Sequence, residues 1–98
     1  MSAFHAQILA SDTLFFDGDC EFMVVPCTDG AMGILSHHSN MIAAVVPGEL
    51  RFQPADEPLR TAAVSSGLVK IEEGEVLLLV DTAERPEDID ANRAKRAA

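Results

Sequence analysis

The chain has 98 residues, enough for one domain that buries a core without disulfides or metals. Its formal net charge is -9, with 16 acidic side chains against 7 Lys and Arg, which argues against nucleic acid and anionic membrane surfaces as partners because both attract clustered cations. The longest uninterrupted apolar runs fall far short of the ~20 residues of a spanning helix, so we expect no direct membrane insertion.

Most of the chain consists of short apolar and β-branched segments separated by turn residues. In chain order, the segments that we expect to be strands are 4–10, 14–16, 20–25, 31–35, 41–46, 49–53, 59–64, 68–71 and 75–81. Turns are predicted at 17–19, 28–30 and 65–67, and Pro26 is expected to end its strand. This spacing predicts a mainly β fold, a two-sheet β-sandwich or flattened barrel of about ten short strands.

Two of the predicted strands, 41–46 and 76–80, are apolar without alternation. Both faces of such a strand are expected to be shielded from water, whereas the outer face of a two-layer sandwich normally meets it. Loops, the C-terminal segment or strands that cross between the sheets could provide the cover. Contact with another protein is the other explanation, since exposed apolar patches mark partner surfaces.

The end of the chain changes character and predicts a short C-terminal helix. Pro86 suits the first helical position, Glu87 and Asp88 suit the first turn, and Lys95 and Arg96 suit the last turn. A helix of about a dozen residues with a weak apolar stripe is marginal in water without a docking surface. We therefore divide the chain into a sandwich domain, 1–84, and the start of a helical region, 85–98.

The residues that could carry chemistry do not form a catalytic pattern. His37 and His38 are adjacent, so on a strand they would point to opposite faces, and no metal site is expected. The chain lacks the Gly-x-Ser-x-Gly elbow and the phosphate-binding Gly-rich loop, so we expect no enzyme and no required cofactor. Cys20 and Cys27 would lie roughly 23 Å apart along one strand, which predicts free buried thiols rather than a disulfide.

The acidic stretch 84–90, followed by Arg93, has two interpretations. It can be a solvated helix start in which Asp90 and Arg93 pair across one turn. Alternatively, Arg93 can donate to a phosphate while Asp90 accepts a hydrogen bond from a base or ribose. The residues by themselves leave both interpretations open.

Taken together, the segments resemble the epsilon subunit of the F-type ATP synthase over the length from Phe4 to the last residues. The resemblance depends on the order and spacing of eight segments, namely 4–8 (FHAQI), 16–18 (FDG), 24–26 (VVP), 29–35 (DGAMGIL), 41–44 (MIAA), 47–51 (PGELR), 64–67 (VSSG) and 80–84 (VDTAE).

The resemblance implies an N-terminal sandwich of two five-stranded sheets followed by a C-terminal helical hairpin, of which this chain would hold only the start. It also implies a non-catalytic rotor subunit in the central stalk of a proton- or sodium-driven ATP synthase. The gamma subunit and the c-ring would be its partners, and it would couple ion transport to ATP synthesis. Its place would be peripheral, at the cytoplasmic face of the bacterial plasma membrane.

The family pattern assigns c-ring contacts to Asp29, Ala31, Met32 and His38. The chain departs from that pattern twice, because Ala31 stands where an acidic residue is common and Ser36-His37 replaces the usual Pro-Gly.

The segment 89–94 resembles the Ile/Leu-Asp-x-x-Arg-Ala pattern that binds ATP in some bacterial epsilon subunits. The implied site residues are Glu84, Ile89, Asp90, Arg93 and Ala94. The alternative function is thus a regulatory module that senses ATP, with ATP as a regulatory ligand rather than a required cofactor.

Overall fold

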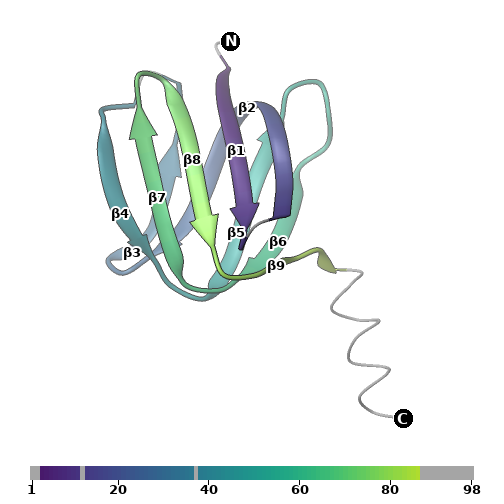
Figure 1. Cartoon of the computed structure of the whole chain (residues 1–98). Coiled ribbons are helices and arrows are strands. Elements are labelled where there is room, and N and C mark those ends of the chain that lie inside the picture. The colour runs from purple at the N-terminus through teal and green to yellow at the C-terminus, as the bar shows by residue number, and fades with distance from the viewer. Residues whose placement is uncertain (1–2, 12, 37, 87–98) are drawn as a thin grey trace.

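The computed structural model describes residues 3–11, 13–36 and 38–86, and this part of the chain contains nine strands (Figure 1). They are β1 (Phe4–Ala10), β2 (Thr13–Cys27), β3 (Gly30–Ile34), β4 (Met41–Val45), β5 (Gly48–Pro54), β6 (Arg60–Val64), β7 (Gly67–Glu72), β8 (Glu75–Val80) and β9 (Ala83–Glu84). The predicted mainly β fold is confirmed. The predicted C-terminal helix falls largely on 87–98, outside the described residues.

The strands form two layers that share β2 (Figure 1). One layer runs β4-β7-β8-β1 and ends on the first half of β2, and the other contains β3, the second half of β2, β5, β6 and β9. All neighbours are antiparallel except β1 and β8, which pair in parallel. Because β2 passes from one layer to the other, both layers belong to one continuously hydrogen-bonded sheet.

The prediction of a turn at 17–19 and of a strand end at Pro26 is wrong, because β2 is a single strand of fifteen residues. Gly18 pairs with Ala6 of β1 and stays in the ladder. Pro26 pairs with Ala31, and its carbonyl accepts a hydrogen bond of 2.9 Å from the Val46 N–H. A proline is tolerated there because only its carbonyl is needed at that edge. The two-residue strand β9 was not predicted.

The core lies between the two layers and comes from alternate residues of each strand. In β8, for example, Val76, Leu78 and Val80 point inward, while Leu79 is 40% exposed. Ile42 of β4 is 65% exposed. The expectation that 41–46 and 76–80 are dry on both faces is therefore not met within the described chain, and neither loops nor crossing strands cover their outer sides.

Cys20 and Cys27 are free and buried, as predicted. Burial raises the pKa of the Cys20 thiol to about 11, and the Asp19 carboxylate adds to the effect. The pKa of Cys27 is raised for the same main reason, loss of hydration of the thiolate. Both thiols therefore act as small apolar groups in the core and are poor nucleophiles at neutral pH.

No helix among the described residues has the length and apolar character needed to span a bilayer.

Candidate partner-binding surface

A row of apolar side chains crosses the outer face of the first layer. The register aligns Ala44 of β4 with Leu68 of β7, Leu68 with Leu79 of β8, and Leu79 with Leu9 of β1. Leu9 in turn pairs with Leu14 at the start of β2. We call these five residues, Ala44, Leu68, Leu79, Leu9 and Leu14, the outer apolar band.

The outer apolar band is open to solvent in this chain. Leu14 and Leu68 are 52% and 50% exposed, and Ile42 extends the band on β4. In a sheet, side chains that are directly opposite on neighbouring strands touch, so the band is a continuous apolar strip rather than scattered residues. A strip of this kind on a small acidic protein points to a partner surface.

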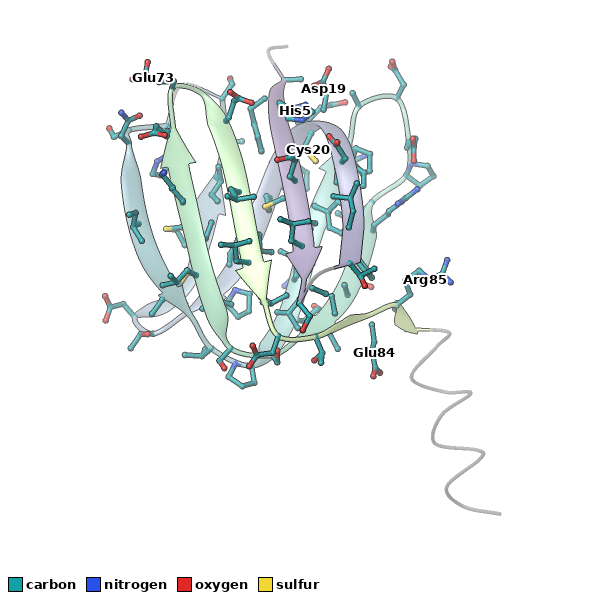
Figure 2. All side chains as sticks on the ribbon, viewed as in Figure 1. His5, Asp19, Cys20, Glu73, Glu84 and Arg85 are labelled. Carbon is teal, nitrogen blue, oxygen red and sulfur yellow. The ribbon has the colours of Figure 1, made fainter. Side chains whose placement is uncertain are left out.

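The same face becomes charged toward the opposite end of the strands. His5 of β1 lies 2.8 Å from an Asp17 carboxylate oxygen and 3.5 Å from one of Asp19. Beside it, Lys70 of β7 pairs with Glu72 at 3.4 Å. Figure 2 shows His5 and Asp19 at one end of the sandwich, with Glu84 and Arg85 at the other. These polar and charged contacts are exposed and contribute little stability. They keep this end of the face hydrated, whereas the band end is apolar.

The four predicted c-ring residues do not lie together. Asp29 is exposed in the β2–β3 turn, next to exposed Ala31 and to Met32, whose side chain packs against the core. The Thr28 N–H donates to the Ala44 carbonyl at 3.3 Å, which places this turn beside the outer apolar band.

His38 follows β3 and precedes β4, and its Nδ1–H donates to the Ser39 carbonyl at 2.9 Å. The neighbouring Asn40 side chain accepts a hydrogen bond from Glu73 in the β7–β8 turn, at the far end of the sandwich. A strand the length of β3 spans about 16 Å, so His38 and Asp29 lie at opposite ends.

Of the predicted ATP residues, only Glu84 lies within the described chain, where it pairs with Ala63 in the β6–β9 ladder. Ile89, Asp90, Arg93 and Ala94 lie outside the described residues. A cavity of about 680 Å³ is lined by Ala83 and Arg85, the sequence neighbours of Glu84, but not by Glu84 itself. Its lining consists of Thr13, Leu14, Phe15, Phe52, Leu59, Arg60, Thr61, Ala83, Arg85 and Pro86.

The described residues contain neither a metal-ligand cluster nor a buried polar side chain. Among them, no group of three or more His, Cys, Asp or Glu side chains is placed to hold a metal ion. No polar or charged side chain among them is buried, so none is held in a water-poor, preorganised site. Arg60 is engaged by Glu57 at 3.1 Å and lies 5.6 Å above the Phe16 ring centroid.

The sequence did not single out Leu9, Leu14 or Leu68 as functional. The sequence contains only part of the information needed to find them, because the apolar segments 76–80 and 41–46 indicate an unusually apolar outer face. The register that aligns the five band residues across five strands comes from the fold.

Comparisons with known proteins agree on one family. Residues 3–86 match the family model described as the ATP synthase Delta/Epsilon chain, beta-sandwich domain. The chain is 40% identical over 97 residues to the ATP synthase epsilon chain of Ruminiclostridium cellulolyticum, covering 99% of this chain and 72% of that one. It is 36% identical over 102 residues to the ATP synthase epsilon chain of Chromobacterium violaceum, covering 100% and 73%.

Solved structures show the same fold. A chain in the cryo-EM structure of the Euglena gracilis mitochondrial ATP synthase (OSCP/F1/c-ring, rotational state 1) matches with a TM-score of 0.86 and 18% identity, covering 99% of this chain and 62% of that one. A chain of the Tetrahymena thermophila mitochondrial ATP synthase central stalk and c-ring matches with a TM-score of 0.75 and 13% identity, covering 90% and 70%.

Proposed function

Because the chain belongs to the ATP synthase delta/epsilon-chain family, whose β-sandwich domain its residues 3–86 match, we propose that it holds the gamma subunit and the c-ring in fixed register within the central stalk. The resemblance inferred from the sequence motifs is confirmed, and the chain is a non-catalytic accessory subunit of ATP synthase. In this role it couples ion flow through the ring, of protons or sodium ions, to ATP synthesis.

The outer apolar band is the observation that carries the proposal. It is a straight row of aliphatic side chains on a rigid sheet, and burying it against gamma removes apolar area from water without desolvating a charge. A contact of this kind resists sliding because side chains of neighbouring strands interlock with the partner as in a protein core. Torque can therefore pass between gamma and the sandwich.

We place the ring contact at the end of the sandwich that carries the β2–β3 turn, with Asp29, Ala31 and Met32. This end adjoins the outer apolar band through the Thr28 to Ala44 hydrogen bond, so one subunit can touch gamma and the ring at the same corner. His38 lies at the other end and is left out of the ring contact in this arrangement. The subunit is held peripherally at the cytoplasmic face of the membrane through these two partners.

The test is a binding experiment with the 98-residue chain, isolated gamma subunit and purified c-ring. We expect Leu68→Glu and Leu79→Glu to keep the fold, because both side chains are exposed, and to weaken gamma binding at least about tenfold by burying a carboxylate in an apolar contact. The matched control is Leu59→Glu, since Leu59 is exposed to a similar extent, 47%, in the loop before β6. Equal gamma binding by all three variants, or no binding by the wild-type chain, would overturn the proposal.

The cavity beside Glu84 favours a second function, regulatory sensing of ATP. Arg60 and Arg85 are two of the four Lys and Arg residues in the described part of the chain, and both line this cavity. The cavity that they line also includes Pro86, which comes shortly before the Asp90 and Arg93 motif in the sequence. Guanidinium groups are good donors to phosphate oxygens, and Arg60 would exchange its Glu57 partner for such a ligand.

Calorimetric titration with ATP tests this second function. We expect saturable binding that Arg93→Ala weakens about tenfold, while Arg51→Ala, which removes a cation paired with Glu49 on β5, leaves it unchanged. ATP binding that is absent, or equal in the two variants, would leave the tail motif without a nucleotide role.

A further inference from the structure

One side of the sandwich has two strands without a charged side chain. It is formed by β3 and β4, and the segments 30–35 and 41–46 contain no Asp, Glu, Lys or Arg, in a chain that is 23% charged. Exposed Leu35 and Ile42 add apolar surface to it. This side continues the outer apolar band, because Ala44 and Ile42 stand on β4.

The backbone of β3 is hydrogen-bonded to a neighbouring strand along one edge only. Within the described chain β3 pairs only with β2, so its other edge has no strand beside it. The Pro26 carbonyl bonds to Val46 on the far side of β2, which makes Pro26 and Ala31 a non-hydrogen-bonded pair. Bonded and non-bonded pairs alternate along an antiparallel ladder, so the peptide groups of Ala31 and Gly33 point away from β2.

This edge has no Lys, Pro or bulge of the kind that often protects edge strands. Natural proteins guard such edges with Lys, Pro, bulges or a covering loop, and β3, with the sequence GAMGI, has none of the first three. Ala31 and Gly33 are exposed, and a Cβ added at Gly33 would meet no atom within 4 Å. The edge of the same layer at β9, by contrast, is two residues long and carries Glu84.

We propose that an extended segment of the gamma subunit pairs with the free edge of β3 and adds a strand to the second layer. The inference rests on the proposed function, since it specifies how gamma is held. Main-chain hydrogen bonds supply the contact, and the uncharged side chains around β3 fit an uncharged strand. Gamma is the occupant because this side is continuous with the outer apolar band that it covers. A rigid strand pairing beside an apolar strip fixes the rotation of one subunit against the other.

A single proline substitution with a matched control tests the strand pairing. Gly33→Pro removes the outward N–H and places a ring against the incoming strand, at an edge position where proline leaves the β2–β3 ladder intact. We expect it to weaken gamma binding at least about tenfold. Gly33→Ala keeps the N–H and enters open space, so we expect gamma affinity within about threefold of wild type. Wild-type gamma affinity in a folded Gly33→Pro chain would overturn the inference.

Amide hydrogen exchange on the wild-type chain decides the matter even if the proline variant fails to fold. We expect the Ala31 and Gly33 amides to exchange fast in the free chain and to become protected in the gamma complex, while Met32 and Ile34 are protected in both. Gamma binding without that protection overturns the strand pairing and leaves the proposed function standing, whereas absent gamma binding removes both. Protection produced by the c-ring alone, or by a dimer of this chain, would assign the edge to another occupant and overturn the inference.

Discussion

Among the described residues, Cys20 is the one whose pKa the fold raises to about 11. Its side chain has no exposed surface, and the raised pKa reflects the cost of placing a thiolate in the core. The sequence was sufficient to predict this burial, because Cys20 opens an apolar segment and lies too far along the strand from Cys27 to form a disulfide. It was not sufficient to identify the partners of Cys20 across the strands, Phe4 and Pro54, because they come from distant parts of the chain.

The raised pKa predicts how stability depends on pH. The unfolded thiol has the ordinary value of 9.0, so above it the unfolded chain loses the proton first and the free energy of unfolding falls until about pH 11. We expect this residue to account for a loss of about 2 to 3 kcal/mol across that window and for none below it. Urea melts at several pH values check the slope. Cys20→Ala should make the slope shallower and leave the part that the raised pKa of Cys27 contributes, and a variant with the wild-type slope would contradict the assignment.

At the scale of elements, the close pairing of β7 and β8 depends on Gly67. It pairs with Val80, and a Cβ at position 67 would lie 1.8 Å from the Leu79 carbonyl oxygen and 2.7 Å from the Val80 Cα. Those atoms are backbone and cannot move aside without breaking the ladder. The sequence pattern predicts a turn at 65–67, whereas Gly67 is already the first residue of β7, and the pattern gives no sign of the close backbone approach there.

We therefore expect Gly67→Ala to destabilise the chain by on the order of 2 to 4 kcal/mol, through strain in the backbone of β7 and β8. Gly33→Ala serves as the control and should stay within about 1 kcal/mol, because its Cβ enters open space. Thermal or denaturant unfolding measures both. If the two substitutions lower the free energy of unfolding equally, the close backbone approach at position 67 does not require a glycine.

The strand for which the prediction from sequence is wrong is β2. Asp17-Gly18-Asp19 has turn composition, yet Gly18 stays in the ladder under the Phe16 ring, whose Cζ would lie 3.2 Å from an added Cβ. Pro26 looked like a strand end because only the pattern along the chain was visible. Which edge of a strand needs its N–H is decided by neighbours far away in sequence, and here that edge uses only the Pro26 carbonyl.

At the scale of the whole molecule, the sandwich and its family could be predicted from strand spacing and ordered motifs. The arrangement of the contact surfaces could not. Asp29 and His38 are close in sequence, but β3 separates them by the length of the sandwich, and only the fold shows that Asp29 shares its corner with the outer apolar band. On the outer face of the first layer, the charged end with His5 and Asp17 differs from the end with Leu68, where the outer apolar band lies.

The central claim is that gamma covers the outer apolar band, and a calorimetric titration of gamma into the wild-type chain tests it most directly. Run at several temperatures and at low and high salt, it measures both the heat-capacity change and the electrostatic share of binding. Burial of an apolar strip predicts a clearly negative heat-capacity change and an affinity that changes little with salt. A heat-capacity change near zero, with an affinity that falls steeply as salt is added, would contradict the account.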